Sequence, residues 1–193
     1  MAKSLINRLF SMLLVVYLGG CAGQQLSPPE VVDFSATGKL ALRGVERGQS
    51  FNFAWQQMGE RYDVEVWGPL GQGRTQLRGE HDLMVISRGT EVLAQGSVDD
   101  IMLANLGWHI PVHALPFWMR GQMGPDAQAD SARRDPQGRL AQFEESGWLV
   151  TLDRYRVERC APGRITASRA GRKLIALLRE VEDPGCNLTT ESA

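Results

Sequence analysis

The stretch FNFAWQQMGERYDVEVWGPLGQGR, residues 51–74, is the part of the sequence that decides the fold. Large apolar side chains alternate with small or polar ones over residues 51–55 and again over residues 62–66. This period of two is typical of β-strands with one buried face, and Met-Gly-Glu at residues 58–60 supplies a turn between them. The stretch therefore predicts an antiparallel hairpin with one apolar face and one solvated face.

An apolar loop follows this hairpin. Glycine and proline residues within 68–73 exclude regular secondary structure there. The large side chains of the segment, Trp67, Pro69 and Leu70, are nevertheless apolar. Because loops run over the surface of a protein, we expect Leu70 to face either water or an apolar partner.

The composition indicates a single globular domain. The chain has 193 residues, a formal net charge of -1 and 43% hydrophobic residues, which suits a sizeable core or a core plus a cavity. Binding to nucleic acid requires a basic patch or stripe, and the near-neutral charge argues against one. The three cysteines exclude a disulfide framework as the main source of stability but allow one bridge.

The first residues have the pattern of a secretory signal. Residues 1–20 contain a basic start, an apolar segment too short to span a bilayer, and two glycines before Cys21. Leu-Gly-Gly-Cys resembles a bacterial lipobox, in which the cysteine carries lipid, and Ala22 after it favours sorting to the outer membrane. We therefore expect Cys21 to anchor the protein to the periplasmic face of the outer membrane; the alternative is an ordinary signal peptide with a chance cysteine. Residues 21–34 are expected to be a tether, with a short helix starting within residues 30–34.

The domain that follows, residues 35–186, is expected to be α+β and mainly antiparallel β. Its first part contains six segments in which polar and apolar residues alternate, separated by turn signals and without a helix between them. This arrangement predicts a strand meander that is curled or barrel-like. The predicted strands are residues 39–43, 50–56, 61–67, 74–78, 83–87 and 91–95.

Two short helices are predicted after this meander. Ser97 followed by Asp99 and Asp100 has the outline of a capping box and of an acidic first turn, and Gly107 is the expected end of the helix. The second helix is expected within residues 113–121, where proline is tolerable only in the first helical turn.

The second helix is apolar almost all round, so another element must cover it. A sheet curled over the helix would provide that cover. Leu115, Trp118 and Met119 on this helix suit a pocket lining as well as a core.

The remaining sequence predicts a second group of strands. We expect residues 127–134, which are small and polar, to form a long loop. The predicted strands are residues 139–144, 148–155, 164–169 and 172–181. Cys160 and Cys186 flank the last hairpin, and in an oxidising periplasm they either pair or remain as two thiols. Residues 187–193 are expected to be a tail.

The sequence contains no recognisable catalytic or metal-binding motif. It lacks a Gly-x-Ser-x-Gly elbow, a Walker loop and a dinucleotide fingerprint. His109 and His113 have the spacing of two ligands on one helix face, but Pro111 lies between them and no carboxylate or cysteine stands close in sequence to complete a site. We therefore expect no enzyme activity, no cofactor and no metal.

A series of short motifs, in the same order over most of residues 39–180, resembles the LolB family of outer-membrane lipoprotein receptors. The chain departs from the family pattern at its ends, where the region before Lys39 is short and the closing tryptophan is missing. The motifs are the lipobox, Phe53-x-Trp55-x-Gln57, Gly68-Pro69-Leu70-Gly71, Leu106-Gly107 before Ile110-Pro111-Val112, Leu115 with Trp118 and Gly121, Gly138-Arg139-Leu140, and Gly147-Trp148.

The resemblance implies a fold and a function. The fold would be an unclosed antiparallel β-barrel wrapped over a few short helices, with an apolar cavity. The protein would be a monomer that accepts acylated lipoproteins from a soluble, LolA-like periplasmic carrier and passes them into the outer-membrane lipid. Leu70, flanked by Trp67 and Pro69, would be the tip that enters the membrane. The expected acyl-chain cavity is lined by Leu40, Phe53, Trp55, Val64, Val66, Leu77, Leu115, Trp118 and Trp148, for each of which core packing is the alternative.

Two other functions fit the same sequence. One is a structural lipoprotein that serves as a scaffold in an outer-membrane assembly, and the other is a carrier of free lipids. A scaffold predicts a filled interior and a large exposed partner patch. A receptor predicts a hollow interior and a protruding Leu70.

Overall fold

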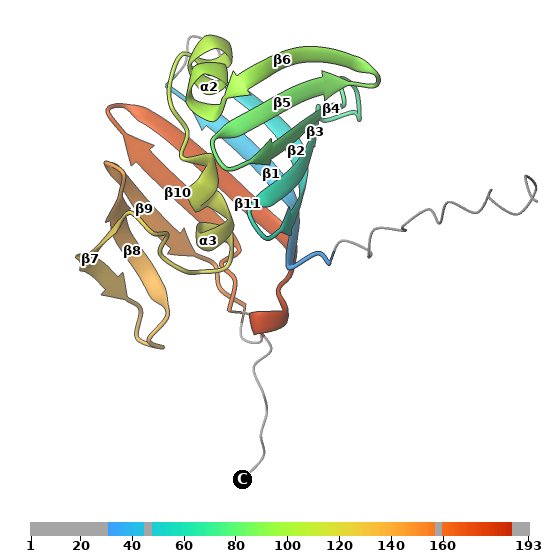
Figure 1. Ribbon diagram of the computed structural model, residues 1–193. Helices are drawn as coiled ribbons and strands as arrows, with labels where there is room; N and C mark the ends of the chain where they lie inside the picture. Colours follow the sequence, from blue (N-terminus) through green and yellow to red (C-terminus); the bar gives the residue numbers. More distant parts are fainter. Residues whose placement is uncertain (1–30, 45–47, 157–159, 187–193) are drawn as a thin grey trace, which may run out of the picture. The chain divides into compact units, whose positions relative to one another are not determined.

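Figure 1 shows the protein as a computed structural model, which describes residues 31–44, 48–156 and 160–186. Residues Val31–Ala193 form a compact unit separate from Met1–Glu30. The predicted signal peptide, the lipid anchor at Cys21, most of the tether and the tail at 187–193 lie outside the described residues.

The described residues contain eleven strands in one antiparallel sheet, with the spatial order β6-β5-β4-β3-β2-β1-β11-β10-β9-β8-β7. The first six strands are β1 (Phe34–Arg43), β2 (Gln49–Met58), β3 (Arg61–Trp67), β4 (Thr75–Glu80), β5 (Leu83–Arg88) and β6 (Glu91–Ser97). The other five are β7 (Ala127–Arg134), β8 (Leu140–Glu145), β9 (Trp148–Asp153), β10 (Arg164–Arg169) and β11 (Arg172–Glu182).

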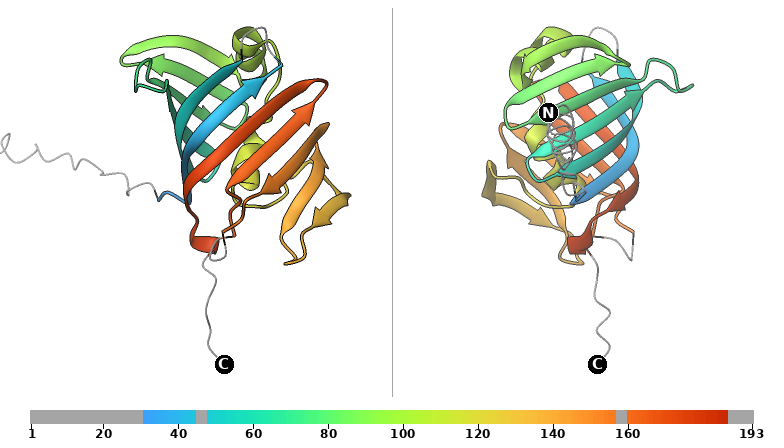
Figure 2. Two further views of the ribbon diagram at one scale, coloured as in Figure 1. Left: turned by 180° about the vertical axis from the view of Figure 1, so that it is seen from behind. Right: turned by 45° about the vertical axis from the view of Figure 1, so that its right-hand side comes forward.

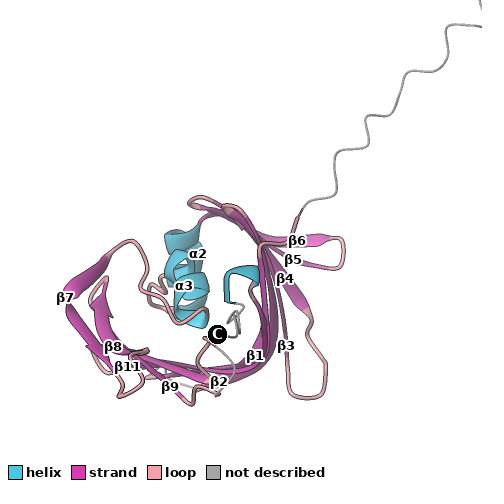
Figure 3. Cartoon of the chain, turned by 90° about the horizontal axis from the view of Figure 1, so that it is seen from below, coloured by secondary structure: helices cyan, strands magenta, loops and turns pink. Residues whose placement is uncertain are grey.

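The sheet consists of two meanders, β1–β6 and β7–β11, which are joined where β1 pairs with β11. Strands β6 and β7 are the two edges and do not pair with each other, so the barrel is unclosed. Viewed along its axis, the sheet curves around the helices, which lie inside it (Figure 3). The predicted fold, an unclosed antiparallel barrel over a few short helices, is confirmed.

The helices connect the two meanders. They are α2 (Val98–Leu106), the 3-10 turn η1 (Val112–Ala114) and α3 (Leu115–Met119); a further 3-10 turn, η2 (Pro184–Cys186), follows β11. The predicted cap of α2 is confirmed: the Ser97 side chain accepts a hydrogen bond from the Asp100 N–H, and Gly107 ends the helix in a left-handed conformation. Pro116 lies in the first turn of α3. Backbone N–H groups of a first turn have no hydrogen-bond partner within the helix, so a proline, which lacks this N–H, is tolerated there.

An ion pair fixes the end of α3 to the end of β11. Arg120 donates to both carboxylate oxygens of Asp183, at 2.9 and 3.1 Å. Burial raises the pKa of the Asp183 carboxyl, but hydrogen bonds from Arg120 and from the Gly185 N–H outweigh it, so the net pKa lies below its usual value. Bidentate pairing with a planar guanidinium is geometrically specific, and here it holds α3 against the β7–β11 meander.

Two predicted segments are wrong. Residues 127–134 are a strand, β7, and not a loop. An edge strand pairs on one side only and is held largely by backbone hydrogen bonds, so it can be as polar as this segment without losing its place in the sheet. The expected helix within residues 30–34 is also absent from its described part: residues 31–33 are irregular, and β1 already begins at Phe34.

Candidate functional site

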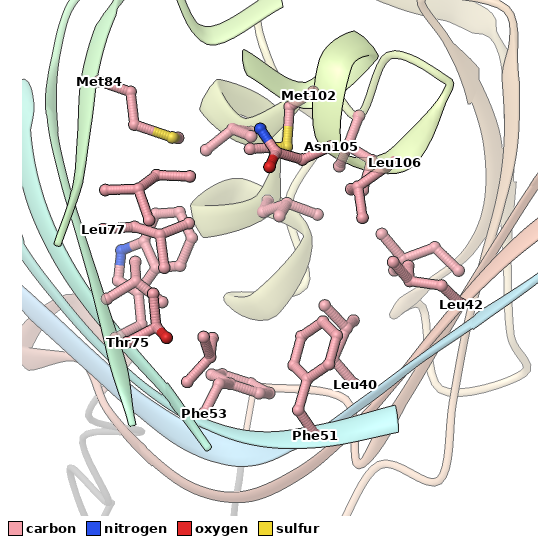
Figure 4. Close-up of a pocket in the computed structure, with 18 of the residues that line it drawn as sticks. Leu40, Leu42, Phe51, Phe53, Thr75, Leu77, Met84, Met102, Asn105 and Leu106 are labelled. Atoms are coloured by element: carbon pink, nitrogen blue, oxygen red, sulfur yellow. The ribbon is translucent and has the colours of Figure 1, made fainter. Parts of the chain in front are cut away.

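A cavity of about 400 Å³ lies on the concave side of the β1–β6 meander, facing helix α2 (Figure 4). Typical ligand pockets have volumes of about 300–1,000 Å³ and predominantly apolar linings. In this cavity the lining is almost entirely aliphatic and aromatic. The space is therefore large enough for a ligand and suits hydrocarbon.

Strand alternation and register place the lining side chains. Val64 of β3 pairs with Trp55 of β2 on one side and with Leu77 of β4 on the other. Leu77 in turn pairs with Ile86 of β5. Directly paired residues project from the same face of a sheet, so this row crosses four strands and points into the cavity.

Seven of the nine residues expected in the cavity line it. They come from strands β1 to β4 and from the start of α3: Leu40, Phe53, Trp55, Val64, Val66, Leu77 and Leu115. Trp118 and Trp148 do not line it, and for these two the expectation is corrected. Both are almost completely buried within the core.

Each of the two tryptophans packs elsewhere for a clear reason. The indole N–H of Trp118 donates to Glu145 Oε2 at 2.6 Å, which satisfies this buried donor. Its ring meets Phe143 edge-on, with a centroid distance of 6.3 Å. Trp148 packs against Trp108, with ring centroids 5.4 Å apart. Both rings therefore fill the space between the helical segment and the β7–β11 meander.

Sequence reasoning missed most of the apolar lining. Strand alternation, continued one step further, identifies Leu42 and Phe51 as inward-facing, like their neighbours Leu40 and Phe53. The helix contributes residues that alternation cannot identify. Met119, which the sequence left open between pocket lining and core, also lines the cavity. The apolar residues missed were Leu42, Phe51, Met84, Ile86, Leu93, Ala94, Met102, Leu106, Ile110, Val112, Ile165, Leu174 and Ala176.

Tyr62 lies at the end of the cavity near the start of β3. Its ring stacks on Trp55 with centroids 5.2 Å apart, and its hydroxyl lies over Gly79, where a Cβ atom would come within 2.1 Å of it. No described residue makes a hydrogen bond to this buried hydroxyl. Burial raises the pKa of Tyr62 to about 12. Gly79 thus makes room for an aromatic wall at this end of the cavity.

The loop that links β3 to β4 projects from the sheet (Figure 2, right-hand view). The side chain of Leu70 is 91% exposed, and Pro69 is also exposed, whereas Trp67 is partly buried beneath the Arg74 guanidinium. The Gly68 N–H donates to the Gln72 carbonyl at 2.8 Å, and the Leu70 N–H donates to the Gln72 side chain at 3.0 Å. These internal bonds give the loop a defined shape with a leucine at its tip.

The other predicted sites are placed as follows. Cys21 lies outside the described residues. Cys160 is disulfide-bonded; because the side chain of Cys186 lies outside the described part, the Cys160–Cys186 pair stays a prediction. His109 contacts Asp99 at 3.2 Å and His113 contacts Asp126 at 3.3 Å, so the two histidines have separate carboxylate partners.

The described residues contain neither a cluster of metal-ligating side chains nor a helix able to cross a membrane. In residues 31–44, 48–156 and 160–186, no three or more His, Cys, Asp or Glu side chains gather as metal ligands would. Over the same part of the chain, each helix is too short or too polar to cross a bilayer.

Known proteins resemble this chain in sequence and in fold. The family model "Outer membrane lipoprotein LolB" matches residues 32–180. Two relatives are named outer-membrane lipoprotein LolB. The one from Chromohalobacter salexigens is 31% identical to this chain, and the match covers 72% of this chain and 72% of the relative. The one from Cellvibrio japonicus is 27% identical, and the match covers 89% of this chain and 94% of the relative. A third relative of the same name, from Stutzerimonas stutzeri, is 31% identical, and the match covers 79% of this chain and 82% of the relative. The crystal structure of a LolA superfamily protein from Nitrosomonas europaea has the same fold, with a TM-score of 0.50 and 7% identity over 80% of this chain and 87% of that one.

Proposed function

This chain belongs to the LolB family of outer-membrane lipoproteins, and from that premise we propose how it acts as a lipoprotein receptor. The cavity takes up an acyl chain of the lipoprotein cargo, and the loop that carries Leu70 passes the cargo to the lipid. The observation that carries the proposal is the hollow apolar interior of about 400 Å³ beside an exposed leucine. Members of this family are lipoprotein transport proteins, which agrees with the lack of a catalytic motif in the sequence.

The volume of the cavity suits one acyl chain. An engineered apolar cavity of about 150 Å³ in another protein binds one benzene molecule. At the same density, a cavity of about 400 Å³ holds roughly 16 carbon atoms. At about 0.8 kcal/mol per CH₂, a chain of that length costs roughly 13 kcal/mol to leave in water. An acylated protein therefore needs such a shelter on its way across the periplasm.

The loop and the anchor complete the proposed mechanism. Leu70 at the tip of a defined loop enters the lipid and brings the cavity close to it. Lipid on Cys21, joined by the tether of residues 21–34, holds the protein at the periplasmic face of the outer membrane. Transfer then runs down a gradient of affinity, from a LolA-like carrier to this cavity and from the cavity to the bilayer.

The alternative functions fit less well. A scaffold predicts an interior filled by its own side chains, whereas the concave face of β1–β6 is hollow. A carrier of free lipids would also need a hollow, but it would not need a leucine held 91% exposed on a projecting loop.

One transfer experiment tests the proposal. A chain that begins at Ala22 lacks Cys21 but retains the compact unit Val31–Ala193. We expect it to accept a triacylated lipopeptide from the purified carrier and to release it to phospholipid vesicles. Leu70→Glu should still fold and accept the lipopeptide but should deliver it poorly, because a carboxylate resists entry into hydrocarbon.

Leu149→Glu is the matched control, since Leu149 of β9 is also an exposed leucine, 40% exposed, on a strand outside the loop. It should accept and deliver normally. If the wild-type chain accepts no lipopeptide, the receptor proposal fails. Normal delivery by Leu70→Glu contradicts only the role of the loop.

A further inference from the structure

The inward-facing rows of side chains in the cavity change from apolar to polar at one end. In β2 the row from Trp55 to Phe51 ends at Gln49, and in β5 the row from Met84 to Ile86 ends at Arg88; Gln49 and Arg88 both line the cavity. Because neighbouring strands are antiparallel, the start of β2 and the end of β5 lie at the same end of the sheet. The loop between β3 and β4, with Leu70 at its tip, lies at that end too.

This end of the cavity is also where it opens to solvent. Gln49 and Arg88 are exposed, and Leu93, which lines the cavity beside them on β6, is 43% exposed. The opposite end is closed by Trp55 and Tyr62, which are 5% and 6% exposed. An amphiphile that enters the cavity therefore has its tail against the two aromatic rings and its head near Gln49 and Arg88.

The N–H donors of the Gln49 carboxamide and the Arg88 guanidinium, at the opening, are available to a ligand. Over the part of the chain that the structure describes, no hydrogen bond or ion pair engages the side chain of Gln49 or of Arg88. Glu91, which pairs with Arg88 in the β5–β6 ladder, makes no ion pair with it. Two other polar side chains of the lining already have partners: the Thr75 hydroxyl donates to the Gly73 carbonyl, and the Asn105 amide donates to the Ile101 carbonyl. The unpaired Tyr62 hydroxyl lies buried at the opposite, closed end.

We propose that Gln49 and Arg88 form a polar collar that binds the oxygen-rich head of an amphiphile whose tail lies in the cavity. The inference rests on the proposed function and specifies the ligand: a hydrocarbon chain that ends in hydrogen-bond acceptors. Guanidinium and carboxamide N–H groups match carbonyl, carboxylate and phosphate oxygens. Such oxygens come from two sources, the acyl ester and amide carbonyls of a lipidated cysteine and the phosphate of a free phospholipid.

Three ligands with the same tail distinguish a head-group site from a merely apolar cavity. The chain that begins at Ala22 is loaded with the fluorescent hydrocarbon diphenylhexatriene, which is then displaced by hexadecane, methyl hexadecanoate or hexadecyl phosphate. For Arg88→Gln we expect about fivefold weaker binding of hexadecyl phosphate at low salt, the effect of one exposed charge pair. We expect a smaller loss for methyl hexadecanoate and no change for hexadecane. The loss for the phosphate should shrink as salt is added.

Arg43→Gln is the control, because Arg43 ends β1 at the same end of the sheet but follows the inward-facing Leu42 and so belongs to the outer face. Loss for both oxygen-headed ligands supports the collar and assigns it to carbonyl and phosphate heads alike. Loss for the phosphate alone supports it and assigns it to free phospholipid. Unchanged affinities in Arg88→Gln, equal loss for hexadecane, or the same losses in Arg43→Gln overturn it. If none of the three ligands displaces diphenylhexatriene from the wild type, the proposal of an acyl-binding cavity is wrong, and the proposed collar is wrong with it.

Discussion

The two meanders of the sheet are built from the same alternating pattern, yet the concave side of β1–β6 is hollow, whereas that of β7–β11 is filled except where Ile165, Leu174 and Ala176 border the cavity. Inward side chains of β2 to β4, such as Phe51, Val66 and Leu77, are only partly buried and line the cavity. On β8 to β10, Phe143, Val150 and Ala167 are fully buried. The pattern of a strand thus shows which face points inward, but it does not show whether anything fills the space in front of it.

The helical connection makes the difference. Trp108 and Trp118 from this connection pack against Trp148 and Phe143 of the β7–β11 meander, and the Arg120–Asp183 pair holds α3 there. Helix α2 faces the other meander mainly with Met102 and Leu106, which leave space. We infer that the filled half supplies the stability that allows the other half to stay open.

The largest expected effect tests this division directly. Trp118→Ala, in the filled half, should lower the free energy of unfolding by about 3–5 kcal/mol, because it leaves a cavity and removes a hydrogen-bond donor from the buried Glu145. Phe51→Ala, in the hollow half, should cost about 1 kcal/mol, because its ring already borders empty space. Urea unfolding of both variants measures the difference.

Equal losses of unfolding free energy in these two variants would contradict this division, because the hollow half would then contribute to stability as much as the filled half. The m-value serves as the control, since an altered slope would indicate a changed unfolded state rather than a lost contact.

A smaller effect is expected from adding volume. Ala167→Leu should cost about 1–3 kcal/mol, because Ala167 is fully buried and overpacking forces its neighbours to move. Ala94→Leu places the same side chain in the cavity lining and should leave stability nearly unchanged. The Ala94 variant should also bind acylated ligands more weakly, because the new side chain occupies part of their space. If Ala94→Leu destabilises as much as Ala167→Leu, the cavity is filled in solution.

Much of the fold could be predicted from alternation and turn signals. The hairpin at residues 51–66, the β1–β6 meander, strands β8 to β11 and the cap at Ser97 were predicted because each is encoded within a few neighbouring residues. Strand β7 was missed because its place depends on a backbone ladder with β8 and not on an apolar face. Polar edge strands carry little local signal of this kind.

The cavity could be predicted only in part, for a related reason. Alternation identified inward-facing residues such as Phe53 and Val64, which do line it. It could not separate them from Trp148, which alternates in the same way but meets Trp108 across the interior. That distinction depends on where the helical connection packs, a tertiary contact with no signature within the strand itself.

The smallest expected effect compares one tyrosine from each half. The Tyr155 hydroxyl, in the filled half, donates to the Leu140 carbonyl at 2.6 Å, whereas the buried Tyr62 hydroxyl at the cavity has no partner among the described residues. At pH 7, Tyr155→Phe should lower the free energy of unfolding by about 1 kcal/mol. Tyr62→Phe should leave it unchanged or raise it slightly, since it removes an unsatisfied buried group.

The same pair has a predictable response to alkaline pH. Burial raises the pKa of both tyrosines to about 12, from an ordinary value of 10.0. Between pH 10 and 12 the unfolded chain therefore binds fewer protons than the folded chain, and the free energy of unfolding falls as the pH rises. Each Phe variant removes one of these titrations, so Tyr62→Phe should become more stable than the wild type above pH 10, and the deficit of Tyr155→Phe should shrink. All other ionisable groups are the same in the three proteins, so urea unfolding of the three at pH 7 and pH 11 isolates the contribution of each tyrosine. A loss for Tyr62→Phe at pH 7 equal to that for Tyr155→Phe would show that the hydroxyl at the cavity is hydrogen-bonded after all, and that the hollow half holds ordered water beside its aromatic wall.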